Sequence, residues 1–76
     1  MNARITTALL ESPDPMTTQV VTSILEEPLF AEGSLERTDF CQQIECMLDY
    51  GYDITTDLIM RIYQVVAITW QQPQAF

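Results

Sequence analysis

The stretch TDFCQQIECMLDYGYDITTDLIMRIYQVV, residues 38–66, decides the fold of this chain. One pattern occurs in it twice, in residues 38–48 and again in residues 56–66: Thr-Asp, an apolar residue, an isoleucine four positions later, and a final apolar pair. Apolar residues at this spacing lie on one face of an α-helix, and threonine and aspartate favour helix N-termini. The pattern reflects common rules of helix formation rather than a repeat family, and it predicts two helices that form an antiparallel hairpin.

The first helix of the hairpin is predicted over residues 38–50. Thr38 can cap its N-terminus, and Asp39 lies in the first turn, where a negative charge suits the helix dipole. Gly51 suits the left-handed conformation that often follows a helix end. The stripe expected to face the core consists of Phe40, Ile44, Met47 and Leu48.

The second helix is predicted over residues 55–71, with an N-terminus at Thr55 or Thr56. Ile54 and Ile59 can form a hydrophobic staple across this start. The segment IYQVVAITW also has the β-branched and aromatic composition of a strand. The length of the segment, its cap and its period of 3.6 residues favour a helix. Its main apolar face carries Leu58, Ile59, Ile62, Val66 and Trp70.

The N-terminal half predicts at least one further helix. Asp14 can cap it and Pro15 suits its first position, so that a helix is predicted over residues 15–26. Residues 1–13 form either an extended arm or a short helix, which the prolines of SPDP end.

Residues 27–37 are interpreted as a connector and residues 72–76 as a tail. Leu29 and Phe30 in the connector are apolar enough to be expected in the core or against a partner. The chain as a whole, residues 1–76, is predicted to be a single all-α domain. It is expected to form a small bundle of three to four short helices, in which the last two make the antiparallel hairpin.

The charge balance indicates what kind of partner to expect. The chain has 11 acidic residues, three arginines and neither lysine nor histidine, which gives a net charge of −8. Direct binding to nucleic acid or to an anionic membrane needs cations, so we expect neither. A basic surface of another protein is the natural complement, because opposite charges speed encounter. The alternative is that the acidity only keeps an apolar small protein in solution.

The same composition gives little support for catalysis. Without histidine or lysine the chain has no imidazole base or metal ligand and no amine for Schiff-base chemistry. Cys41 and Cys46 lie about 140° apart on a helix, so one helix cannot present both thiols to one metal ion. We therefore expect no enzymatic activity and no cofactor.

The segment DYGYDITTD, residues 49–57, invites two further readings. Counted from Asp49 as an EF-hand loop, positions 3, 6 and 12 are Gly51, Ile54 and Met60, and none of them fits a calcium site. Nothing in the spacing of the three aspartates brings two carboxylates together for acid–base chemistry. The segment is better explained as the end of one helix and the cap of the next.

Two surfaces are predicted to bind a partner. The first is the loop with Asp49, Tyr50, Tyr52, Asp53 and Asp57, because tyrosines are enriched at binding hot spots and the carboxylates suit an arginine-rich surface. The second is the back of the last helix, whose residues are Met60, Gln64 and Ile68. An apolar back on a surface helix indicates a shared interface, unless the first helix or the connector covers it.

The resulting hypothesis is a small acidic module that regulates or inhibits a partner protein, such as a nucleic-acid-binding protein whose phosphate site the carboxylates occupy. The alternative is a structural homo-oligomer, an assembly subunit or a chaperone. The N-terminus lacks the apolar core of a secretory signal, and no segment approaches the length of a membrane span. We therefore expect a cytoplasmic location with reduced thiols.

Overall fold

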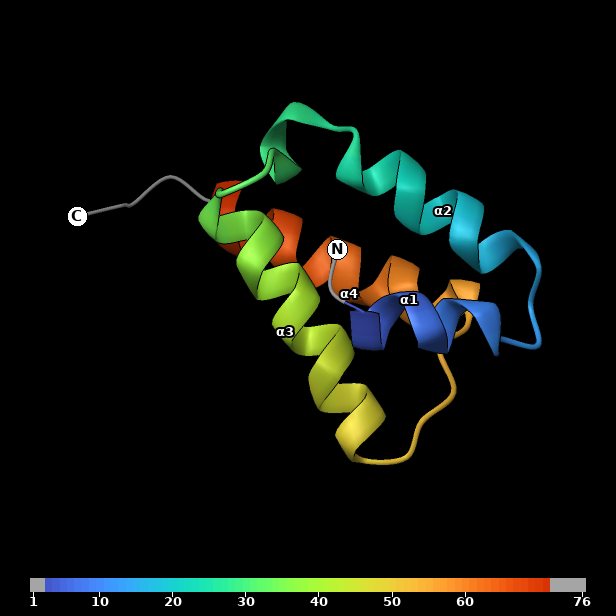
Figure 1. Cartoon of the computed structure of the whole chain (residues 1–76). Coiled ribbons are helices and arrows are strands. Elements are labelled where there is room, and N and C mark those ends of the chain that lie inside the picture. The colour runs from blue at the N-terminus through green and yellow to red at the C-terminus, as the bar shows by residue number, and fades with distance from the viewer. Residues whose placement is uncertain (1–2, 72–76) are drawn as a thin grey trace.

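The computed structural model describes residues 3–71, and the predicted tail at residues 72–76 lies outside this part. Figure 1 shows the arrangement of its helices. The elements in chain order are α1 (Ala3–Leu10), α2 (Met16–Leu25), the 3-10 helix η1 (Pro28–Phe30), α3 (Leu35–Asp49) and α4 (Thr56–Gln71). The prediction of an all-α fold is confirmed, since the described residues contain four α-helices and no strand.

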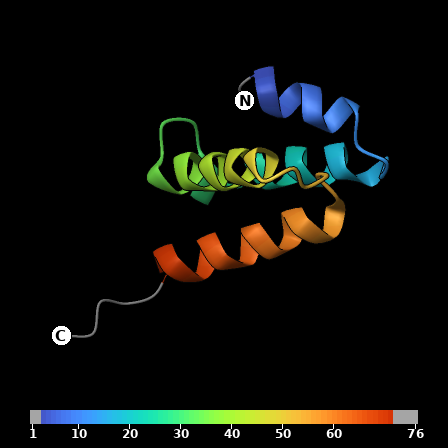
Figure 2. The same ribbon diagram turned by 90° about the horizontal axis from the view of Figure 1, so that it is seen from below.

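The helices lie in three layers. Helices α2 and α3 form the middle layer, with α1 on one side of it and α4 on the other (Figure 2). The predicted hairpin of the last two helices is also confirmed, because α3 and α4 pack closely together. At the open end of this hairpin the Trp70 Nε1–H donates to Asp39 Oδ2 at 3.0 Å.

The predicted start of the helix at residues 38–50 is wrong. Helix α3 begins at Leu35, about one turn earlier, and Ser34 is its cap. The Ser34 hydroxyl oxygen accepts from the Arg37 N–H at 3.1 Å, while the Thr38 hydroxyl donates back to the Ser34 carbonyl at 3.1 Å. Serine is a strong N-cap residue, and capping at Ser34 adds a turn of helical hydrogen bonds that capping at Thr38 would forgo.

The remaining helix boundaries agree with the predictions to within one residue. The helix predicted at residues 15–26 spans Met16–Leu25, and the helix predicted at 55–71 spans Thr56–Gln71. Of the two alternatives for residues 1–13, the structure shows the short helix, α1. The connector is not wholly irregular, because Pro28–Phe30 forms one 3-10 turn.

Phe30 is the centre of the core. It is fully buried, and its ring lies 5.4 Å from that of Phe40 in an edge-to-face arrangement and 5.6 Å from that of Tyr63. Its ring thus joins α3 and α4, and the η1 turn that carries it contacts both α2 and α3. The other buried apolar residues of the same cluster are Ile5, Leu9, Val21, Ile24, Ile44, Ile54, Ile59, Ile62 and Val66.

A small polar network joins the turn between α1 and α2 to the start of α4. Thr17 is fully buried, and its hydroxyl lies 3.3 Å from that of Thr56. The Ser12 hydroxyl donates to the Ile54 carbonyl at 2.6 Å. Because a buried hydroxyl without a partner is costly, these bonds fix how the two segments meet.

Asp14 belongs to the same network and serves two helices. Its Oδ1 accepts from the Met16 N–H at 3.0 Å and its Oδ2 from the Thr56 N–H at 3.4 Å, so that one carboxylate lies at the N-termini of α2 and α4. Hydrogen bonds, first from Thr56 and then from the Met16 backbone, lower the pKa of Asp14 below its ordinary value of 3.8. Since these hydrogen bonds stabilise the ionised carboxylate in the folded protein, ionisation of Asp14 stabilises the fold.

We expect Phe30→Ala to lower the free energy of unfolding by about 3–5 kcal/mol, since it removes a fully buried ring and leaves a cavity. A chain of this length has a total stability of only about 4–11 kcal/mol, so the loss is a large share of it. Urea unfolding followed by circular dichroism measures it. The matched control is Leu35→Ala, because Leu35 is 64% exposed and its loss should cost less than about 0.5 kcal/mol. Equal losses in the two variants would contradict the central role of Phe30.

The stability that Asp14 contributes should depend on pH. The pKa of Asp14 is lower in the folded protein than in the unfolded chain, where it is near 3.8. The stability that its ionised carboxylate contributes is therefore present at pH values above 3.8, and it is lost as the pH falls through the lower pKa of the folded protein. Asp14→Asn should lower Tm at pH 7, and the Tm difference between wild type and variant should shrink as the pH falls below about 4. Thermal unfolding from pH 7 to pH 2 tests this, with Glu32→Gln, an exposed substitution of the same charge change, as the control.

Candidate protein-binding surfaces

The hairpin tip, defined as residues 49–57, has a fixed backbone where α3 ends. The Tyr52 N–H donates to the Met47 carbonyl at 3.1 Å and the Gly51 N–H donates to the Leu48 carbonyl at 3.0 Å. This pair of bonds is a Schellman motif, which places its glycine in the left-handed conformation, and Gly51 has a φ of 84°. The predicted role of Gly51 is confirmed, and Tyr50 and Tyr52 are held on either side of it.

The other end of the tip is fixed where α4 begins. The Thr55 hydroxyl oxygen accepts from the Leu58 N–H at 3.2 Å, as expected of a helix cap. Ile54, before the cap, is 2% exposed, and Ile59 is fully buried in the same cluster. The predicted staple positions are therefore both in the core, and the loop between Gly51 and Thr55 is short and anchored at both ends.

The structure places all five predicted residues of the tip on the surface. Tyr50 is 74% exposed and Tyr52 is 60% exposed, which are high values for aromatic side chains. Asp49, Asp53 and Asp57 are exposed as well. The loop between α3 and α4, at the closed end of the hairpin (Figure 1), thus carries two exposed tyrosines and is bordered by exposed aspartates.

Each of the three arginines has a partner within the chain. Arg4 of α1 forms an ion pair with Asp49, and Arg61 pairs with Asp57 one helical turn earlier at 2.9 Å. The Arg37 guanidinium donates to the Phe30 carbonyl at 3.4 Å. Exposed ion pairs of this kind contribute only about 0–1 kcal/mol, so a partner could exchange its own cations into them at little cost.

The residues predicted on the back of α4, Met60, Gln64 and Ile68, are all exposed and follow one another at four-residue spacing along the helix. Gln64 is exposed and Ile68 is 58% exposed, on the side of the helix that points away from its buried face. Met60 is only 37% exposed and lines a groove toward α2. Val65, which was not predicted, is 52% exposed and adds apolar surface near Ile68.

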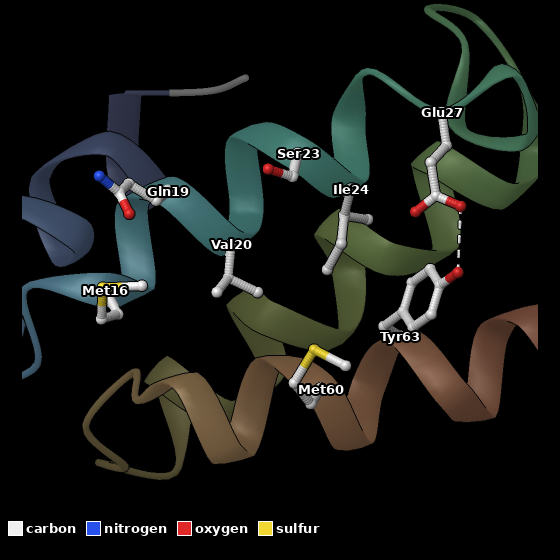
Figure 3. A pocket seen from close by; sticks show the side chains of 8 residues that line it. All are labelled: Met16, Gln19, Val20, Ser23, Ile24, Glu27, Met60 and Tyr63. Atoms are coloured by element: carbon white, nitrogen blue, oxygen red, sulfur yellow. Dashed lines mark hydrogen bonds between the residues drawn. The ribbon is translucent and has the colours of Figure 1, made fainter.

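The α2–α4 groove is a feature that sequence reasoning missed. It has a volume of about 390 Å³ and runs along α2 and just beyond its end (Figure 3). Met60 and Tyr63 form its α4 wall. Its other wall is one stripe of α2, composed of Met16, Gln19, Val20, Ser23 and Ile24, and is continued by Glu27 just beyond the helix end.

One hydrogen bond joins the two walls of the groove at its Glu27 end. The Tyr63 hydroxyl donates to Glu27 Oε1 at 3.0 Å, and this bond is the main reason that the pKa of Tyr63 is raised. Met16 and Val20 lie four residues apart on the side of α2 that faces the groove, and Met16 is 53% exposed.

The thiols and carboxylates do not gather into a further site. Cys41 is half-buried, and this burial raises the pKa of its thiol, whereas Cys46 is exposed. Within residues 3–71 no group of three or more cysteine, aspartate or glutamate side chains is placed to hold a metal ion. None of the helices in the same range is both long and apolar enough to cross a membrane.

Comparison with known proteins gave no relative. No protein-family model, curated protein or solved structure matches this chain.

Proposed function

We propose that this chain is a small acidic module that binds a basic surface of a partner protein through its hairpin tip and thereby regulates or inhibits that partner. The observation that carries the proposal is the exposure of Tyr50 and Tyr52, at 74% and 60%, among three exposed carboxylates. Large aromatic side chains are costly to leave in water, and tyrosine is enriched where binding energy is concentrated.

The charge of the chain supports the same partner. With a net charge of −8, the protein attracts basic surfaces over a distance of about one Debye length, roughly 8–10 Å at moderate salt. At the tip, arginine or lysine side chains of the partner can replace Arg4 and Arg61 as the ion-pair partners of Asp49 and Asp57. A nucleic-acid-binding protein is one suitable partner, because its phosphate-binding cations would accept carboxylates in the place of phosphates.

Binding of a fluorescent arginine-rich peptide without apolar residues, followed by anisotropy, tests the tip. Tyr52→Ala should weaken binding at least tenfold, as expected of a hot-spot residue. Asp53→Asn should weaken it a few-fold and should also reduce its dependence on salt. The matched control is Glu32→Gln, which removes one negative charge from an exposed position outside the tip.

Two results would contradict this assignment. If Asp53→Asn and Glu32→Gln weaken binding equally and Tyr52→Ala has no effect, the charge acts without a defined site. If wild type does not bind the peptide at low salt, the proposed basic partner is wrong.

A second candidate function is that of a homo-oligomer or a small assembly subunit or chaperone. The observation in its favour is the exposed apolar surface of α4, where Val65 and Ile68 are more than half exposed. For self-association through this face, Ile68→Asp should convert the oligomer to a monomer in sedimentation velocity. Thr69→Asp, the neighbouring exposed position, should leave it intact. A wild-type monomer at about 100 μM, a concentration far above the Kd of a stable dimer, would eliminate this candidate.

A further inference from the structure

We propose that the α2–α4 groove binds an amphipathic helix of a partner protein, which places an arginine or lysine against Glu27 and apolar side chains against Met16, Val20 and Met60. This inference rests on the proposed function in one respect, namely that the partner protein is basic. It concerns a different surface from the hairpin tip, because none of the residues that line the groove belongs to residues 49–57.

The length of the groove fits a short helix. Its wall on α2 extends from Met16 to Ile24, which at 1.5 Å per residue is about 12 Å, or slightly more than two helical turns, and Glu27 continues the wall just beyond the helix end. A partner helix of about the same length presents apolar residues at intervals of three and four positions along one face. That spacing is how amphipathic helices bind grooves between other helices.

The walls of the groove suit apolar side chains of varied shape. Met16 is 53% exposed and Met60 is 37% exposed, one on each wall, with Val20 between them on the α2 side (Figure 3). Methionine is unbranched and polarisable, and it adapts to different apolar partners more readily than leucine or valine does. The groove can therefore bury apolar side chains of a partner helix that differ in size and shape.

Glu27 supplies the polar end of the groove. One of its carboxylate oxygens accepts from the Tyr63 hydroxyl at 3.0 Å, which fixes the orientation of the carboxylate. Figure 3 shows the other oxygen on the side of the groove. A carboxylate held in one orientation beside an apolar groove is suited to a guanidinium or ammonium at the end of an apolar stem.

A second copy of this chain is a poorer occupant. No arginine lines the groove, and a second copy has only three arginines against 11 acidic residues. A second copy would also bring eight further net negative charges toward Glu27. Association of like charges is opposed, whereas a basic helix removes this repulsion.

The test uses the full chain with ¹³C-labelled methionine methyl groups and three synthetic helical peptides of about three to four turns. The first peptide carries leucines on one face and arginines elsewhere. The second replaces the arginines by glutamates, and the third scrambles the first so that the apolar face is lost. We expect the first peptide to shift the methyl signals of Met16 and Met60 in a saturable way. The Met47 signal should not move, because Met47 lies on α3 against the core.

Variants then separate the two parts of the groove. Glu27→Gln keeps an oxygen to accept from Tyr63 and removes the charge, and it should weaken binding of the first peptide about fivefold. Val20→Glu should weaken it more than tenfold, because it places a charge in the apolar part of the groove. Thr22→Glu is the matched control, since Thr22 is exposed on the opposite side of α2. Circular dichroism verifies that each variant is folded. If Val20→Glu does not fold, the methyl signals and the Glu27→Gln variant test the groove without it.

The proposal is overturned if Met16 and Met60 do not shift at saturation, or if the scrambled or glutamate peptide binds as tightly as the first. It is also overturned if their signals move with protein concentration alone, which would identify a second copy as the occupant. Loss of binding in Tyr52→Ala but not in the groove variants would leave the tip as the site and reject the groove. The reverse result would support the groove, and the tip would still be decided by its own test with the peptide that has no apolar residues.

Discussion

The packing of Phe30 against Phe40 and Tyr63 is the contact on which the rest of the structure depends. Its three rings come from η1, α3 and α4, and the η1 turn also contacts α2. The three rings therefore join the connector to α3 and α4, and the η1 turn that carries Phe30 links them to α2. A short chain buries only a modest fraction of its surface, so a large aromatic residue in the connector supplies burial that the short helices alone do not provide.

The sequence was sufficient for the parts of the fold that follow from local chemistry. The stripe of α3, the glycine after it and the cap of α4 all have strong local signals, and each is found where the pattern places it. The start of α3 was missed because Leu35 lies just after the cap and is 64% exposed, so that the first turn adds nothing to the apolar period. Only the hydrogen bond from Arg37 to Ser34 shows which of two good capping residues is used.

The surfaces were harder to predict than the core. The exposure of Tyr50, Tyr52 and the tip aspartates could be inferred, because they flank a helix end and its glycine. The groove could not, since it depends on how far α2 stands from α4, and this distance is set by tertiary packing. Met60 illustrates the difference: its position on the helix was clear from the sequence, but its neighbour on the other wall was not.

The anchoring of the hairpin tip affects the entropy of any association through it. Its backbone is tied down by the Schellman bonds around Gly51 and by the Thr55 cap, and the Ser12 hydroxyl holds the Ile54 carbonyl at 2.6 Å. Loops that order only on contact lose backbone freedom at that moment, whereas this one has already lost it during folding. What remains to be ordered is two tyrosine rings with two torsions each, which leaves the tip preorganised.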